Sequence, residues 1–128
     1  VPQSADWRIK EKRMTAYSPF FKLEIFCPAE NVDEILEALA SAHAGEIGKY
    51  DHCSTILQVQ GSYRPLEGAN PAVGEVGKLF VGSEYKIEIN CREEYLSEAI
   101  QAVREVHPYE EPVINVIALA NHRYGATM

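Results

Sequence analysis

An internal repeat with an offset of 64 positions constrains the fold of this chain more than any other feature of its sequence. Without a gap, Phe21–His43 aligns with Tyr85–His107, with eight identities in 23 positions. Any two amphipathic units share apolar positions, but they need not share a cysteine and a histidine as well. The identical pairs are Lys22/Lys86, Glu24/Glu88, Ile25/Ile89, Cys27/Cys91, Glu30/Glu94, Glu34/Glu98, Ala38/Ala102 and His43/His107.

Each copy of the repeat predicts a strand followed by a helix. Residues 21–25 and 85–89 alternate apolar with charged side chains, which is typical of a strand with one buried face. Residues 32–42 and 96–106 then carry an apolar stripe at helical spacing. The chain therefore contains two strand–helix units of the same design.

The helix ends carry local signals of uneven strength. Asn31 with Glu34 resembles a capping box at the first helix, and Gly45 suits a left-handed cap at its end. Pro108 stops the second helix, which has no convincing N-cap side chain.

A further strand is predicted after each helix, at Cys53–Gln60 and Val113–Leu119. Two βαβ units with right-handed crossovers predict an α+β ferredoxin-like βαββαβ sandwich, a four-stranded antiparallel sheet of order 4-1-3-2 with two helices on one face. The Gly-, Pro- and Asn-rich loop Ser62–Gly82 joins the halves, and a loop of that length is often functional. A short strand near Lys78–Val81 would shorten it.

Composition limits the chain to one domain and a few classes of partner. With 128 residues, 46% of them apolar, it can build a single core. A net charge of −7 argues against nucleic acid as a partner. No apolar run is long enough to cross a bilayer and no signal peptide is visible, so we expect a cytoplasmic protein without a membrane partner. We expect a flexible extension over residues 1–19, the domain over 20–119 and a tail over 120–128.

The cysteines form no CxxC pair and no disulfide framework. Strands one and three are expected to lie side by side and parallel, which would place Cys27 next to Cys91. Packing is the first interpretation of this pair, and a disulfide or soft-metal pair is the alternative.

Two clusters carry side chains of the metal-binding types. Asp51, His52 and Cys53 follow the first helix, but successive strand residues point to opposite faces, so the alternative is a glycine-shaped turn with an exposed histidine and a buried cysteine. His107 and Glu110 follow the second helix, where they could bind a cation. The alternative there is a structural corner in which His107 bonds the backbone.

A third cluster, in the long loop, contains Arg64, which could bind a carboxylate or phosphate in a bidentate manner or serve as an ordinary ion-pair partner. No phosphate-binding glycine motif, nucleophile elbow or catalytic triad is recognisable.

Together these clusters resemble the PII/CutA-like domain of the Nif-three-like proteins, in a stand-alone version, over residues 20–119. The last motif is also similar to the end of the CutA proteins. The resemblance implies the ferredoxin-like fold and a homo-oligomer, with a trimer built through sheet edges favoured; it does not imply the hydrolase activity of larger relatives. The motifs are Gly45-x-Ile47-Gly48-x-Tyr50-Asp51-x-Cys53, Gly61-x-Tyr63-Arg64-Pro65-x-x-Gly68-x-x-Pro71, Val76-Gly77 and His107-Pro108-Tyr109-Glu110-x-Pro112.

The leading hypothesis is a non-enzymatic, oligomeric binding or regulatory module that senses a divalent metal ion or a small ligand at turns between subunits. The alternatives are a purely structural interaction domain, an accessory subunit of a hydrolase, and an enzyme using His107 or Cys53. The candidate metal ligands are His52, Cys53, His107 and Glu110, and the candidate residues for a small ligand are Tyr50, Asp51, Arg64, Glu67 and Tyr109.

Overall fold

The computed structural model describes residues 18–128, so the expected extension over residues 1–19 falls almost entirely outside the described residues. No helix within 18–128 combines the length and the apolar character needed to span a membrane. The elements are β1 Phe20–Cys27, η1 Ala29–Asn31, α2 Val32–Ser41, β2 Thr55–Tyr63, β3 Phe80–Arg92, α3 Glu93–Val106, β4 Ile114–Ala118 and η2 Asn121–Tyr124.

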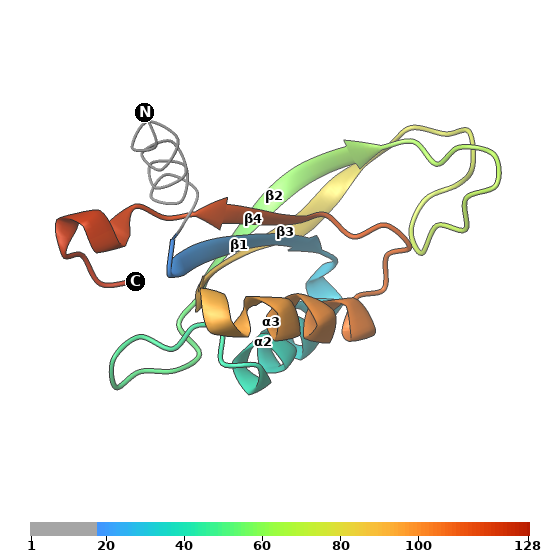
Figure 1. Ribbon diagram of the computed structural model, residues 1–128. Helices are drawn as coiled ribbons and strands as arrows, with labels where there is room; N and C mark the ends of the chain where they lie inside the picture. The colour runs from blue at the N-terminus through green and yellow to red at the C-terminus, as the bar shows by residue number, and fades with distance from the viewer. Residues whose placement is uncertain (1–17) are drawn as a thin grey trace, which may run out of the picture.

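The molecule has two layers, a sheet and a pair of helices that cover one of its faces (Figure 1). The four strands lie in the order β2-β3-β1-β4, and every neighbouring pair is antiparallel. This arrangement confirms the predicted ferredoxin-like sandwich and its strand order.

The core lies between the helices and the inward-facing residues of the two central strands. Leu23 and Ile25 of β1 and Ile87 of β3 have no solvent-exposed surface, and they pack in one cluster with Ile35 of α2 and Val103 of α3. Each such side chain contributes roughly 1.5–3 kcal/mol through burial. The alternation seen in the sequence therefore selects the buried face correctly.

The two central strands run antiparallel, so the expectation of parallel neighbours was wrong. The β2–β3 hairpin reverses the chain between the two halves, and Glu24 of β1 lies opposite its repeat partner Glu88 of β3. The halves are thus related by a pseudo-two-fold rotation. Cys27 pairs with Tyr85 and Cys91 with Phe21, at opposite ends of the strand pair, and both thiols are free.

The uncovered face of the sheet carries ion pairs that repeat this symmetry. Lys22 lies 2.8 Å from Glu88, and its repeat partner Lys86 lies 3.0 Å from Glu24. Lys86 also lies 3.0 Å from Glu88, which joins the pairs into one network. Bonds from the lysines lower the pKa of both glutamates.

The end of α2 differs from the expected cap. His43, rather than Gly45, takes the first left-handed conformation, with φ of 67°. The N–H of Ala44 reaches the carbonyl of Leu39 at 3.0 Å, and that of His43 reaches Ala40 at 3.1 Å, as in a Schellman motif. The expected capping box was also wrong, because Asn31 makes no side-chain cap bond.

The two strands of the hairpin extend further into the expected loop than the sequence pattern indicated. β2 continues to Tyr63 and pairs there with Phe80 at the start of β3, so the irregular loop covers only residues 64–79. The hairpin projects beyond the rest of the sheet, and its loop bends back toward the connection between α3 and β4 (Figure 1).

Candidate functional site

A cleft of about 720 Å³ lies where the β2–β3 hairpin meets the connection between α3 and β4. Two of the sequence motifs, Gly61–Pro71 and His107–Pro112, meet here although more than thirty residues separate them. The lining residues are Phe26, Val59, Gln60, Gly61, Ser62, Tyr63, Arg64, Pro65, Ala69, Pro71, Ala72, Val73, Glu84, Tyr109, Glu110, Glu111, Val113 and Asn115.

The hairpin loop is held in place by bonds that its motif residues make. The hydroxyl of Tyr63 donates a hydrogen bond to the carbonyl of Val73 across the loop. The N–H of Gly77 donates to the carbonyl of Pro65 at 2.8 Å, and Pro65 itself is buried. These bonds give the cleft an ordered wall built from backbone and apolar side chains.

Glu110 connects the two motif segments. Its carboxylate accepts a hydrogen bond of 3.2 Å from the N–H of Asn70 in the hairpin loop. This bond closes one side of the cleft and links a turn in the second half of the repeat to the loop between the halves.

His107 fixes the connection below the cleft through both ring nitrogens. Nε2 lies 2.7 Å from the carbonyl oxygen of Phe26, so it carries the proton, and Nδ1 accepts the N–H of Tyr109 at 3.1 Å. The ring is nearly buried, and burial lowers the pKa of His107. A metal ion on this ring would have to displace one of the two bonds.

A carboxylate and two phenols form the polar centre of the cleft. The hydroxyl of Tyr109 donates to Glu84 Oε2 at 3.3 Å, and the rings of Tyr109 and Tyr63 lie 6.5 Å apart between centroids. Burial, together with the negative charge of Glu84, raises the pKa of both phenols. Both tyrosines are therefore neutral hydrogen-bond donors at physiological pH.

Glu84 occupies space that a glycine leaves free on the neighbouring strand. An added Cβ at Gly61 would lie 2.2 Å from Glu84 Oε1. Gly61 of the loop motif thus has a steric role next to the carboxylate.

The remaining candidate residues are distributed unevenly around the cleft. Arg64, Tyr109 and Glu110 line it, and His107 supports it from below. Glu67 lies exposed in the hairpin loop but is not among the lining residues.

The Tyr50–Cys53 cluster lies at the opposite end of the sheet, in the turn after α2 (Figure 1). Its backbone is tied to β3, because Gly45 N–H donates to the Asn90 carbonyl at 2.8 Å and Cys53 N–H donates to the Gly45 carbonyl at 3.0 Å. Tyr50 and Asp51 are both exposed.

His52 lies between two carboxylates at this end. Its Nδ1 is 3.0 Å from Asp51 and its Nε2 is 3.2 Å from Glu37, and the bond to Asp51 raises the pKa of His52. Across residues 18–128, no three His, Cys, Asp or Glu side chains gather closely enough to hold a metal ion. Within one chain, His52 and Cys53 lie at one end of the sheet, and His107 and Glu110 lie at the other.

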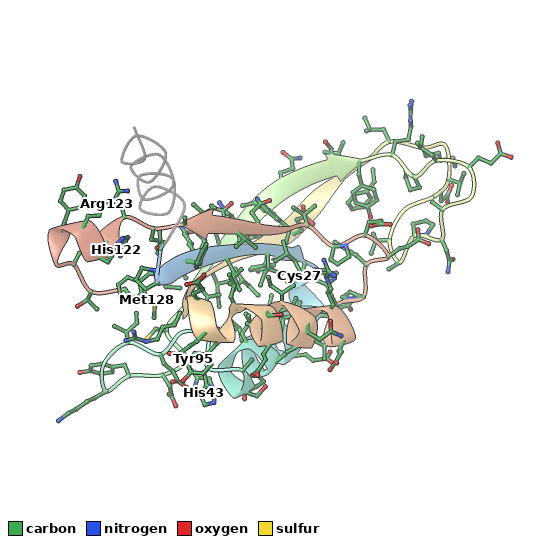
Figure 2. All side chains as sticks on the ribbon, in the orientation of Figure 1. Cys27, His43, Tyr95, His122, Arg123 and Met128 are labelled. Atoms are coloured by element: carbon green, nitrogen blue, oxygen red, sulfur yellow. The ribbon has the colours of Figure 1, made fainter. Side chains whose placement is uncertain are left out.

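Cys27, which lies at the same end of the molecule as the cleft, is inaccessible to solvent. Figure 2 shows Cys27 between the sheet and the helices, whereas His43 and Tyr95 lie near each other at the other end. Burial, with a smaller effect of nearby Glu84, raises the pKa of the Cys27 thiol to about 11. Burial likewise raises the pKa of Cys91 to about 11.

Glu84 and Phe26 are site residues that the sequence pattern missed. Glu84 precedes the alternating segment 85–89 that predicts the strand, and it follows the predicted loop Ser62–Gly82, so neither signal includes it. The available signal was Gly61, since a glycine within a strand often marks close approach by a neighbour.

The chain is 37% identical over 107 residues to a GTP cyclohydrolase 1 type 2 homolog of Halalkalibacterium halodurans and 36% identical over 102 residues to that of Bacillus subtilis. These alignments cover 84% and 80% of this chain but only 29% and 27% of the relatives. A solved Bacillus cereus protein related to NIF3 superimposes with a TM-score of 0.71 at 32% identity, over 82% of this chain and 27% of its own. Over most of its own length the chain is similar to one part of the NIF3-related proteins.

The fold of the chain is shared with CutA proteins as well. CutA from Xylella fastidiosa matches with a TM-score of 0.61 and 20% identity, over 80% of this chain and 86% of its own. At that identity the likeness establishes the fold alone. No family model matches the chain. These relationships are consistent with a small binding or regulatory module.

Proposed function

We propose that this chain is a non-enzymatic, homo-oligomeric binding module that takes a small organic ligand in the cleft between the β2–β3 hairpin and the α3–β4 connection. The observation that carries this proposal is the convergence of two separate motifs on one cleft of about 720 Å³. This volume is within the range of roughly 300–1,000 Å³ typical of small-molecule sites.

The chemistry of the lining supports binding rather than catalysis. Apolar and aromatic side chains such as Val59, Val73 and Tyr63 form most of the surface, with a few polar groups at fixed places, as in ligand sites generally. The adjacent histidine, His107, is engaged through both ring nitrogens and is not poised as a base. Cys27 below the cleft is protonated near neutral pH, because its pKa is about 11.

A tryptophan that fills the cleft is expected to abolish ligand binding. Ala72 is exposed and lines the cleft, so Ala72→Trp would place an indole in the space a ligand needs. Ala120→Trp makes the same change at an exposed position beyond the far end of β4. A fragment library is screened by ligand-observed NMR against all three proteins. We expect hits that Ala72→Trp loses and Ala120→Trp retains; the absence of any hits, or hits kept by both variants, would contradict the proposal.

The uncovered sheet face supports the homo-oligomeric part of the proposal, for which we favour a trimer. Half-exposed Leu57 of β2 and Ile117 of β4 flank the ion-pair network on this face. Ile56 and Val116, the neighbouring exposed residues of the same two edge strands, point to the helix side of the sheet. Exposed apolar side chains on a sheet face that no helix covers can contribute to a protein interface. The free cysteines suit a reducing compartment, and we place the protein in the cytoplasm on that ground.

Introducing a charge on this face is expected to dissociate the oligomer. Leu57→Asp would bury an unpaired carboxylate at an interface, which costs several kcal/mol. Sedimentation equilibrium should show a lower molecular mass for Leu57→Asp and an unchanged mass for Val76→Asp, a control in the hairpin loop. If the wild-type protein sediments as a monomer, or if Leu57→Asp keeps the wild-type mass, the uncovered face is not the interface.

A more specific version of the proposal is that the oligomer binds a divalent metal ion between subunits. It would need His52 and Cys53 of one subunit to meet His107 and Glu110 of another, because these pairs lie at opposite ends of the sheet. Titration calorimetry with Zn²⁺ and Cu²⁺ on wild type and His52→Ala tests it directly.

A further inference from the structure

We propose that the ligand of the cleft is an organic ammonium ion with an apolar body, bound with its cationic group at Glu84 and against the rings of Tyr63 and Tyr109. This inference rests on the proposed function of the cleft and specifies the chemical class of its ligand. It is carried by three independent features: the charges of the lining residues, the placement of the aromatic rings, and the unfilled hydrogen-bonding capacity of Glu84.

The charges that line the cleft favour a cation. Three carboxylates, those of Glu84, Glu110 and Glu111, face one guanidinium, that of Arg64. Glu110 is already used by the hairpin loop through Asn70, and Glu111 is exposed. Glu84 is the half-buried member of the set, and electrostatic interactions are less screened at such a position than at the surface.

Glu84 has more hydrogen-bonding capacity than the described residues fill. A carboxylate can accept about four hydrogen bonds. The donor found for Glu84 within residues 18–128 is the hydroxyl of Tyr109, at the long distance of 3.3 Å. A partly desolvated carboxylate gains most from a partner that is itself positively charged.

The aromatic rings beside Glu84 suit the same ligand. The rings of Tyr63 and Tyr109 lie 6.5 Å apart with an angle of 59° between their planes, so they present two walls at one place. Ring faces attract ammonium groups through their quadrupole. At the edge of the cleft, Phe26 already receives the ammonium of Lys86 at 5.8 Å from its centroid, which shows this interaction within the molecule itself.

Gly61 leaves the space that the carboxylate of Glu84 occupies. Because an added Cβ at Gly61 would lie 2.2 Å from Glu84 Oε1, any larger residue there must move the carboxylate away from its place in the cleft. The glycine of the motif thus provides a second way to disturb the ligand without removing a charge.

The test compares two probes of similar size and opposite charge, hexylammonium, whose three N–H groups can donate to Glu84, and hexanoate, by titration calorimetry on the full chain. We expect the ammonium probe to bind at least about tenfold more tightly than hexanoate, as a desolvated cation–π contact with a carboxylate partner allows. Glu84→Gln keeps the shape of the side chain and should weaken the ammonium probe at least about fivefold. Glu98→Gln, an exposed glutamate on α3, should leave its affinity unchanged.

A second variant keeps the test decisive if Glu84→Gln folds poorly. Gly61→Ala retains the charge but displaces it, and it should also weaken the ammonium probe while leaving hexanoate unaffected. Equal or tighter binding of hexanoate, or an ammonium affinity that neither variant changes, overturns the ammonium assignment. If fragments still bind wild type and are lost in Ala72→Trp, the cleft remains a ligand site and only its ligand class was wrong.

Discussion

Replacing Gly45 with alanine is expected to lower the free energy of unfolding by about 3 kcal/mol or more. Gly45 has φ of 78°, which costs an L-residue roughly 1–2 kcal/mol. An added Cβ would also lie 2.8 Å from the carbonyl oxygen of Cys53 and 2.9 Å from Ile89 Cδ1. The first of these atoms belongs to backbone that is hydrogen-bonded to Gly45 itself, so it cannot move away without breaking the turn.

Gly48 provides the matched control within the same turn. Its φ of 58° is also left-handed, but a Cβ there would meet no atom within 4 Å. Gly48→Ala should therefore cost about 1 kcal/mol, the conformational part alone. Urea denaturation of both variants gives the comparison. Equal losses of stability would show that the close approach of Gly45 to Cys53 has no energetic weight.

Replacing His107 with alanine is the second large effect, with an expected loss of about 2–4 kcal/mol. The change leaves the carbonyl of Phe26 and the N–H of Tyr109 without the partners they have in the folded protein. It also removes the support of the connection that forms one side of the cleft, so ligand binding should fall along with stability. His43→Ala is the control, since it is the repeat partner of His107 but is exposed and should cost less than about 1 kcal/mol.

The pH dependence of stability should report on the same histidine. Burial holds the pKa of folded His107 below its ordinary value near 6.5. The unfolded chain therefore takes up a proton first on acidification, and stability present above about pH 6.5 is lost as pH falls through the lowered pKa. His52 has a raised pKa and changes stability in the opposite sense, as pH rises.

Comparing wild type with His107→Ala between pH 5 and 7.5 cancels the contribution of His52, which both proteins keep. The expected result is a shallower loss of stability on acidification in His107→Ala than in wild type, measured by urea unfolding at each pH. Parallel curves for the two proteins would mean that His107 is protonated equally well in the folded and unfolded chains.

The sequence allowed the architecture to be predicted because each element had its own periodic signal. Alternation at Leu23 and Ile25 identified the buried face, and the helical stripes identified the covering layer. The antiparallel sheet was predicted correctly, whereas the parallel placement of strands one and three was wrong, because the β2–β3 hairpin between them reverses the chain. Glu84 was not predicted as a site residue, because it lies on β3 between the Gly- and Pro-rich loop and the start of the regular alternation.

The candidate site was predicted in part, for a related reason. Arg64, Tyr109 and Glu110 were singled out by residue type, and they line one cleft. The predicted strand order 4-1-3-2 already places the turns after the two helices far apart within one chain. It does not show that the loop between the halves meets the second of these turns, because the course of that loop has no periodic signal. Similarly, the left-handed cap of α2 falls on His43, a residue type that tolerates this conformation less well than glycine does.

Because a rotation relates the two halves, equivalent turns of the repeat lie at opposite ends of the molecule and can have different roles. Because Glu24 faces Glu88 at the centre of the sheet, each copy of the repeat supplies the turn at a different end of the domain. The turn after α2 is committed to packing against β3, while the turn after α3 is combined with the hairpin to form a cleft. The sequence of one turn can therefore change without affecting the turn at the opposite end. The core between the two ends preserves the fold during such changes.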